Sequence, residues 1–382
     1  MTFVIDGEMG NRDKQQEISE EKVRRTKGEQ GMNQFQLPGC LIIEEGACER
    51  LNEILSDCIP GIEKKKIVIA TEDALIPIMK PYLEEMKRDL PKSDIYLIEE
   101  NSFQEAMELA KHICMEDIEV IIGVGGGKVL DVAKYAGFVG KIHYICVPTT
   151  LSNDSLSSPV AVLGTEGDAR KTLKCAIPAG IVVDVNVIMG APVSHLQSGI
   201  GDTISKYTAL YDWKLDAAHR KERVDDFSYL ISDMALSSLC YNEEKSLKSK
   251  EFIKILTQSL VLGGLAMEIA GNSRPCSGSE HLFCHSLEEN HREIQISHGM
   301  AVALGSLVSC RLQGRDVARL EKVLHAYHMD MDPMNWGITK EIFTDAWMRA
   351  ADTRKDRHTV LNEVTLTEET LVGIYEELRA GK

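Results

Sequence analysis

Residues 120–137 have the sequence VIIGVGGGKVLDVAKYAG, and this stretch decides how the first half of the chain folds. The β-branched run Val120–Val124 is typical of a buried strand, and the three glycines at 125–127 follow it directly. Apolar residues then recur at helical spacing over Lys128–Gly137. A strand-to-helix turn of this kind points backbone N–H groups at an anion, and residues without side chains let a pyrophosphate come close. The stretch therefore favours a phosphate-binding turn, with an ordinary tight turn as the alternative.

Strand and helix patterns alternate on both sides of this turn. Further β-branched runs predict buried strands at Lys66–Ala70, Asp94–Ile98, Ile142–Val147 and Ile181–Val185. Helical spacing of apolar residues is found between them at Ala74–Arg88 and Phe103–Cys114. This alternation predicts an α/β fold with a mostly parallel, Rossmann-like sheet that has helices on both faces.

The second half of the chain has no strand pattern and is expected to be all-helical. Helical periodicity is found at Ser198–Lys214, Asp226–Leu239, Glu251–Ala270, His298–Leu312 and Asp316–Tyr327. Because a single core stops growing at roughly 250–300 residues, the 382 residues suggest two domains. We expect an α/β domain at residues 34–191 and a helical domain at residues 192–382.

Residues 1–33 differ in composition from the rest of the chain, since acidic and basic side chains crowd into a segment with few large apolar residues. Such a segment cannot bury enough surface to offset its ordering entropy. We expect a charged, mobile extension, and the alternative is a solvated surface helix over Lys14–Lys27. The segment also lacks the basic start and apolar stretch of a signal peptide.

The charge balance limits the partners of the protein. With 43 basic and 59 acidic side chains the net charge is −16, which argues against nucleic acid or an anionic membrane as the main partner. The longest apolar stretch, Leu256–Ala270, contains polar residues and is shorter than the roughly 20 residues of a bilayer span. The ten cysteines form no CxxC pair, so we expect free thiols and a cytoplasmic protein. A phosphorylated ligand would need a local basic pocket.

A second polar loop follows the predicted strand at Ile142–Val147. Eight of the eleven residues at 148–158 carry a hydroxyl, amide or acid side chain. The carboxyl ends of parallel strands are where open α/β sheets bind ligands. A polar loop is common at this position, but two consecutive strand ends with anion-friendly loops favour a cofactor crevice.

Histidines cluster in the helical half. His281 and His285 stand four residues apart, so they share a helix face and could ligate one metal ion, which a distant carboxylate or third histidine would complete. A structural histidine pair is the alternative, and spacing alone does not decide which histidines coordinate. Asp202 follows Gly199-Ile-Gly at an expected helix start, where a capping role is equally typical.

Basic residues gather near the C-terminal end of the sequence at Arg354-Lys355-Asp-Arg357-His358. Their charge makes Arg354, Lys355 and Arg357 candidates for holding a phosphate group. The alternative is a solvated, charged turn.

Several motifs, in this order, resemble those of the sn-glycerol-1-phosphate dehydrogenases, which belong with the iron-containing alcohol dehydrogenases, glycerol dehydrogenases and 3-dehydroquinate synthases. The resemblance covers the chain from about residue 34 onward. The motifs are GGGKVLDVAK at 125–134, VPTTLSNDSLSSP at 147–159, GIGDTISKY at 199–207, SRPCSGSEH at 273–281 and RHTVL at 357–361. The resemblance implies a dehydroquinate synthase-like fold with the active site in the cleft between the α/β and helical domains.

The resemblance also implies roles for individual residues, by their positions in these motifs. NAD or NADP would be lined by Gly125, Gly126, Gly127, Lys128, Val129, Asp131, Thr149, Ser152 and Ser158. A divalent metal, usually zinc but iron or nickel in some cases, would be held by Asp202, His281 and His298. The catalytic groups facing the substrate would be Asp154, Asp202 and His285, with Arg357 as a phosphate contact on charge grounds.

The implied activity interconverts dihydroxyacetone phosphate, a small phosphorylated three-carbon substrate, and sn-glycerol 1-phosphate by hydride transfer, in a homo-oligomer. The sequence departs from the family pattern at Leu151, Asn153 and His358, where proline, histidine and tyrosine are usual. A polyol or other alcohol dehydrogenase therefore stays open, as do a 3-dehydroquinate synthase-like lyase and a non-catalytic relative. Glu72 and Asp73 hint at binding of a ribose hydroxyl, but ordinary turn chemistry would also place acids there.

Overall fold

The computed structural model describes residues 35–165, 170–220 and 223–381. The expectations for residues 1–33 lie outside the described residues. The predicted boundary at residues 191–192 falls in the short link between α6 (Val185–Gly190) and α7 (Val193–Ile204).

A six-stranded parallel sheet organises the first half of the chain, in the order β1-β8-β5-β4-β2-β3. Its strands are β1 (Cys40–Glu44), β2 (Ile67–Thr71), β3 (Ser93–Leu97), β4 (Val120–Gly125), β5 (His143–Pro148) and β8 (Gly180–Asp184). In the register of β4 and β5, Gly125 pairs with Pro148. The glycine turn and the polar loop therefore begin side by side at the carboxyl edge of the sheet, where we expected the cofactor crevice.

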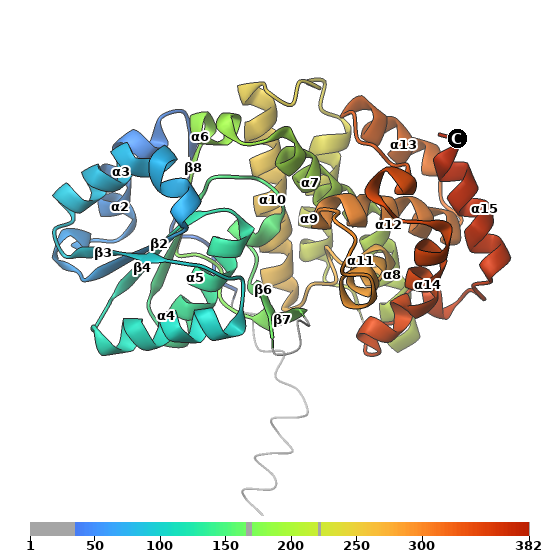
Figure 1. Cartoon of the computed structure of the whole chain (residues 1–382), viewed down its shortest axis with the longest axis horizontal. Coiled ribbons are helices and arrows are strands. Elements are labelled where there is room, and N and C mark those ends of the chain that lie inside the picture. Colours follow the sequence, from blue (N-terminus) through green and yellow to red (C-terminus); the bar gives the residue numbers. More distant parts are fainter. Residues whose placement is uncertain (1–34, 166–169, 221–222, 382) are drawn as a thin grey trace, which may run out of the picture. The chain divides into compact units, whose positions relative to one another are not determined.

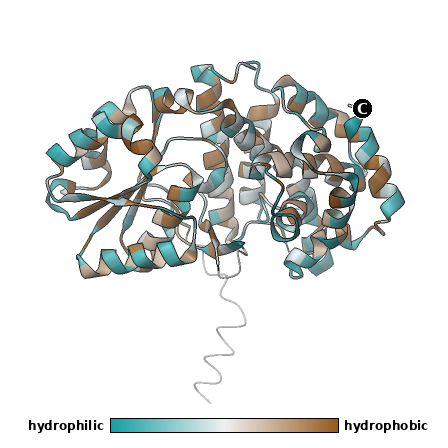
Figure 2. Ribbon diagram, in the orientation of Figure 1, coloured by the Kyte–Doolittle hydropathy of each residue, from teal (hydrophilic) through white to brown (hydrophobic). Residues whose placement is uncertain are grey.

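Helices cover both faces of the sheet, as the alternation predicted. One face packs on α2 (Leu51–Cys58) and α3 (Ile76–Asp89), and the other on α4 (Phe103–Met115) and α5 (Gly127–Gly140) (Figure 1). Figure 2 shows that the central strands are mainly apolar, whereas the helices that cover the sheet combine apolar and polar residues. Successive residues of a central strand enter opposite layers: Val68 contacts the α4–α5 layer and Ile69 the α2–α3 layer.

The sequence did not predict the outer parts of this half. β1, α2 and the antiparallel pair β6 (Val160–Gly164) and β7 (Arg170–Lys174) were all missed. The expectation that all ten cysteines are free thiols was wrong for two of them, since Cys40 on β1 and Cys58 at the end of α2 form a disulfide. Spacing along the sequence did not reveal this pair, because a parallel sheet brings β1 beside the end of a helix that follows it.

The second half is helical, which confirms the predicted fold class. Beyond α6 and α7 it contains α8 (Lys206–Arg220), α9 (Asp226–Cys240), α10 (Lys250–Ala270), α11 (Ser279–Asn290), α12 (His298–Leu312), α13 (Val317–Ala326), α14 (Lys340–Ala350) and α15 (Glu368–Arg379). The single helix expected at Ser198–Lys214 is divided between α7 and α8 at Ser205. Asp202 therefore lies in the last turn of α7, and the capping role considered for it at a helix start was wrong.

Helix α10 contains Leu256–Ala270, the longest apolar stretch of the sequence. By length and composition it could cross a bilayer, but 67% of its most apolar window is buried inside the protein. A helix covered in this way is typical of a protein core.

Candidate active site

A cavity of about 520 Å³ lies where the carboxyl edge of the sheet meets the helical half. Its walls come from the start of α5, the loop after β5, the facing helices α7, α11 and α12, and the segment that follows α14. Fourteen of the candidate site residues named from the sequence line it: Glu72, Gly126, Gly127, Lys128, Asp131, Ser152, Asp154, Ser158, Asp202, His281, His285, His298, Arg354 and Arg357. The structure thus brings together side chains from both halves of the chain.

The three predicted metal ligands converge in this cavity from three different helices. Asp202 comes from α7, His281 from α11 and His298 from α12, and their ligating atoms all lie within 4.8 Å of one another. The Nε2 atoms of His281 and His298 are 3.8 and 3.9 Å from Asp202 Oδ1. Two imidazole nitrogens and one carboxylate oxygen are a donor set that suits zinc and other first-row divalent metals. The residues present therefore fit a metal ion.

Each ligand histidine is oriented through its second ring nitrogen. His281 Nδ1 lies 3.0 Å from Glu280 Oε1, and Glu280 is fully buried and accepts a 2.7 Å hydrogen bond from the Thr208 hydroxyl. His298 Nδ1 lies 3.4 Å from the buried Cys284 sulfur. Contacts of this kind fix the tautomer and direction of a ligating imidazole, so that both Nε2 atoms face Asp202.

Close backbone packing brings these helices together. A Cβ on Gly299 of α12 would stand 1.8 Å from the Ser198 carbonyl oxygen of α7, and one on Gly201 would stand 2.0 Å from the Gly299 carbonyl oxygen. A Cβ on Gly305 would stand 2.7 Å from the Glu280 carbonyl oxygen of α11. Only glycine fits at such distances, so α12 rests directly on the backbones of α7 and α11. This contact brings His298 within reach of Asp202 and His281.

The carboxyl groups of Asp154 and Asp202 lie in the same cavity. The Asp154 backbone N–H donates to Asp202 Oδ2 at 3.0 Å, and burial together with the Asp202 charge raises the pKa of Asp154 to about 6. Burial opposes the charged form of Asp202, but the nearby imidazole of His281 and the charge of buried Lys206 outweigh it and lower its pKa to about 2. The two carboxyls therefore titrate far apart, with Asp202 ionised while Asp154 can hold a proton.

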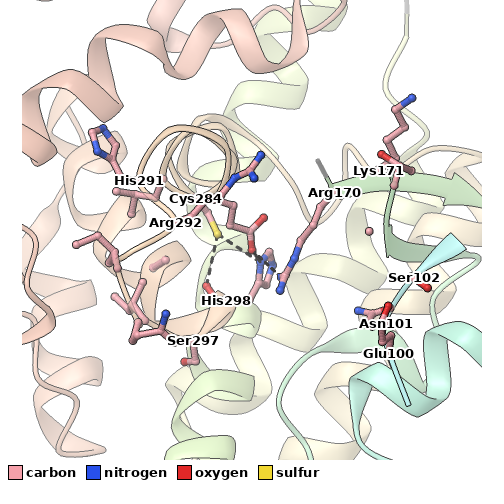
Figure 3. Close-up of a pocket in the computed structure, with 18 of the residues that line it drawn as sticks. Glu100, Asn101, Ser102, Arg170, Lys171, Cys284, His291, Arg292, Ser297 and His298 are labelled. Atoms are coloured by element: carbon pink, nitrogen blue, oxygen red, sulfur yellow. Dashed lines mark hydrogen bonds and ion pairs between the residues drawn. The ribbon is translucent and has the colours of Figure 1, made fainter. Parts of the chain in front are cut away.

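His285 and Glu288 of α11 line the cavity beside the metal-binding triad. His285 Nδ1 is 3.7 Å from Glu288 Oε2, and burial lowers the pKa of His285 to about 4, so its ring is neutral at physiological pH. Glu288 also pairs with Arg170 of β7 at 3.1 Å. Figure 3 shows Arg170 extending from β7 toward His298, on the side opposite Cys284. Strand β7 thus closes this side of the site by an ion pair to α11.

The predicted cofactor residues divide into two groups. Gly126, Gly127, Lys128, Asp131, Ser152 and Ser158 line the cavity, whereas Gly125, Val129 and Thr149 do not. A Cβ on Gly125 would overlap Val129 at 2.5 Å, and the Thr149 N–H donates to the Gly125 carbonyl oxygen at 2.9 Å. Gly125, Val129 and Thr149 therefore fix the shape of the turn without facing the cavity. Asp131 is buried and accepts hydrogen bonds from Lys134 and from the Val162 N–H.

An ion pair stands beside the glycine turn. Lys128 Nζ is 2.6 Å from Glu72 Oε2, and both side chains line the cavity. Asp73, the other acid considered for a ribose contact, is exposed and does not line it.

A basic pocket lies in the same cavity. Arg357 donates to Ser277 Oγ at 2.7 Å and to the Ser273 hydroxyl, and Arg354 donates to Thr172 Oγ1 at 2.7 Å. Burial and the neighbouring guanidiniums of Arg274 and Arg354 lower the pKa of Arg357 to about 10. Lys355 is not part of this pocket, because its exposed side chain pairs with Asp352 at 3.6 Å. The strongly acidic protein therefore has the local positive charge that a phosphate ligand requires.

Comparison with known proteins agrees with this geometry. Residues 42–192 match the family model of the iron-containing alcohol dehydrogenases. The glycerol-1-phosphate dehydrogenase [NAD(P)+] of Aeropyrum pernix is 34% identical over 301 residues, which is 76% of this chain and 84% of that protein. The enzyme of the same name from Methanosphaera stadtmanae is 31% identical over 345 residues, 89% of this chain and 96% of that protein. The chain belongs to the glycerol-1-phosphate dehydrogenase family.

Solved structures show the same fold for this glycerol-1-phosphate dehydrogenase family member. A probable glycerol dehydrogenase from Sinorhizobium meliloti superposes with a TM-score of 0.73 at 20% identity, covering 91% of this chain and 98% of that one. Glycerol dehydrogenase from Schizosaccharomyces pombe gives 0.71 at 21% identity, with 91% of each chain covered.

Three buried groups of this glycerol-1-phosphate dehydrogenase family member were not predicted from the sequence. They are Glu280 and Cys284, which contact the ligand histidines, and Lys206, which donates to the Asp202 carbonyl oxygen at 3.2 Å. A signal existed only for Glu280, because an acid directly before a ligand histidine at a helix start is well placed to orient it.

Proposed function

We propose that this protein interconverts dihydroxyacetone phosphate and sn-glycerol 1-phosphate, with NAD(P) as the redox partner. The observation that carries the proposal is the juxtaposition, in one cavity, of the Asp202–His281–His298 triad and the guanidiniums of Arg354 and Arg357. A metal ion held by the triad would bind a carbonyl or hydroxyl oxygen of the substrate, and the arginines suit a phosphate group on the same small molecule.

This arrangement gives each group of residues a separate role. A divalent metal held by Asp202, His281 and His298 would act as a Lewis acid on the substrate oxygen. NAD(P), with its phosphates against the turn at Gly126 and Gly127, would carry the hydride. The remaining steps belong to side chains of this chain.

The other cavity residues position the substrate and transfer protons. The serine-held guanidinium of Arg357, with Arg354 beside it, fixes the phosphate end of the substrate. Asp154, whose raised pKa leaves part of its population protonated near neutral pH, holds a proton on its carboxyl group for the developing alkoxide. Neutral His285 accepts or passes on a proton in the reverse direction.

The finer assignments rest on the donor set and the sequence. Two histidines and one aspartate favour zinc, with the remaining coordination position open for substrate. The Glu72–Lys128 pair offers a carboxylate to a ribose hydroxyl and an ammonium to a ribose phosphate, so we propose that both NAD and NADP are accepted. A cytoplasmic location and a homo-oligomeric state stay predictions.

The test is NADH oxidation by zinc-loaded enzyme with dihydroxyacetone phosphate and dihydroxyacetone compared side by side. We expect strong preference for the phosphate ester, and a product that sn-glycerol-3-phosphate dehydrogenase does not oxidise. Preference for free dihydroxyacetone would instead make the protein a polyol dehydrogenase.

A further inference from the structure

A second group of metal-ligating side chains lies outside the active-site cavity. It consists of His219 in the last turn of α8, His358, and Glu363 directly after the short helical turn Val360–Asn362. The two imidazole rings stack with centroids 3.9 Å apart and planes 5° from parallel, and His358 Nε2 is 2.5 Å from Glu363 Oε1. One ligating atom from each residue lies within 4.8 Å of the other two.

We propose that His219, His358 and Glu363 form a second binding site for a divalent transition-metal ion of the zinc type. Two imidazoles and one carboxylate again give the donor set that such ions prefer. Zinc bonds of about 2.0–2.2 Å place neighbouring donor atoms about 3.4 Å apart. His358 Nε2 and Glu363 Oε1, at 2.5 Å, are closer than that value, and no two of the ligating atoms are more than 4.8 Å apart. Side-chain rotations that tilt the two stacked rings, so that one nitrogen of each points at the ion, complete the site.

The backbone around the ligands is already fixed, which lowers the entropic cost of binding. The His358 carbonyl oxygen accepts a 2.8 Å hydrogen bond from Arg274, and the Glu363 N–H donates to the Val360 carbonyl oxygen at 3.0 Å. Thr359, between them, forms a capping box with Asn362. Only the three ligand side chains need to reorient.

Nearby charges permit a cation at this position. Arg220 follows His219, but its guanidinium pairs with Asp216 at 2.9 Å and donates to the Asp356 carbonyl oxygen. The site also lies at the carboxyl end of α8, where the helix dipole favours positive charge. Exposure of His219 and Glu363 to solvent leaves a path for the ion to enter.

Zinc stoichiometry tests the proposal without relying on activity. The full-length protein is freed of metal with a chelator and dialysed to equilibrium against Zn²⁺, and bound zinc is measured by atomic emission. We expect two zinc ions per chain in the wild type, one in His219→Ala and one in His358→Gln. His281→Ala, which lacks an active-site ligand, should also bind one, and the double variant His219→Ala/His281→Ala none.

His325→Ala is the matched control, since His325 is an exposed histidine in the last turn of α13 that belongs to neither triad. It should bind as much zinc as the wild type. One zinc in the wild type, or equal zinc in His219→Ala and His325→Ala, would overturn the proposal. Because His219 is exposed, its replacement leaves the core intact, and an unchanged circular dichroism spectrum verifies the fold.

Discussion

The ring of His281 is engaged at both nitrogens, with Nε2 facing Asp202 and Nδ1 facing Glu280. His281→Ala removes one of three ligands, and we expect loss of the active-site zinc and of turnover, because two ligands hold the ion far more weakly. Zinc content of the purified variant measures the first effect. Quenching of protein fluorescence by NADH should persist, since the glycine turn is untouched.

His285→Ala is the matched control for that experiment. His285 lies one helical turn further along α11 but faces Glu288 rather than Asp202. The control should retain its zinc while losing activity. Zinc retained in His281→Ala and lost in His285→Ala would reverse the ligand assignment.

Arg357 supplies the residue-scale test of phosphate recognition. Arg357→Gln removes a charged contact worth about 1.5–3 kcal/mol, so we expect the KM for dihydroxyacetone phosphate to rise roughly 10- to 100-fold. Activity with free dihydroxyacetone should change little. Lys355→Gln, two residues away with an exposed side chain, should leave both substrates unaffected. An equal loss with both substrates in Arg357→Gln would show that the arginine supports structure instead.

At the scale of elements, the close contact of α12 with α7 is what assembles the metal site. Gly299→Ala places a methyl group 1.8 Å from the Ser198 carbonyl oxygen, which forces the helices apart. We expect a loss of about 1–3 kcal/mol in the free energy of unfolding, together with weaker zinc binding as His298 moves. Urea unfolding and zinc titration measure the two effects.

Gly373→Ala gives the comparison for that variant. Gly373 lies inside α15, and no atom outside its own helix lies near the position of an added Cβ. Alanine is the better helix former, so this change should stabilise the protein by about 0.5–1 kcal/mol and leave zinc binding unchanged. Destabilisation in both variants would point to a general cost of replacing helical glycines, not to the helix contact.

The central elements could be predicted because burial on both faces gives them a plain pattern. β2, β4 and β8 are wholly buried and appear as continuous β-branched runs. β1 and β7 are partly exposed, and β7 has the sequence RKTLK, so neither has such a run. The break between α7 and α8 was missed because the apolar pattern continues through Ser205, which is itself buried.

The site was predictable in part for a related reason. Helical spacing reports which residues share a face of one helix, and it therefore paired His281 with His285. The contact of His281 with His298 and Asp202 joins three helices, and only the resemblance to a family supplied it before the structure. Cys284 acts through a tertiary neighbour, His298, and no local pattern records this contact.

At the scale of the whole molecule, buried acids make stability depend on pH. Burial and the charge of Glu280 raise the pKa of Asp212 from its ordinary 3.8 to about 6, although the Ser279 and Val360 N–H groups donate to it. The folded protein thus binds this proton more tightly than the unfolded chain. The resulting cost to stability is fully present above pH 6 and is relieved as the pH falls from 6 to 3.8.

Asp212→Asn should flatten this dependence. As the pH falls from 7 to 4, the free energy of unfolding of the wild type should rise relative to that of the variant by up to about 3 kcal/mol. Urea titrations across this range measure the difference. Asp233→Asn, at an exposed aspartate, should follow the wild type at every pH, and a parallel course for Asp212→Asn would contradict the prediction.

The distribution of the ligands over three helices also sets an order in time. A nascent chain leaving the ribosome exposes the whole parallel sheet, the glycine turn and the polar loop after β5 before α11 and α12 are synthesised. At that stage only Asp202 of the active-site triad exists. The residues of the sheet can therefore begin to fold early, whereas the Asp202–His281–His298 site for a divalent metal can form only after α12 has docked on α7 and synthesis is far advanced.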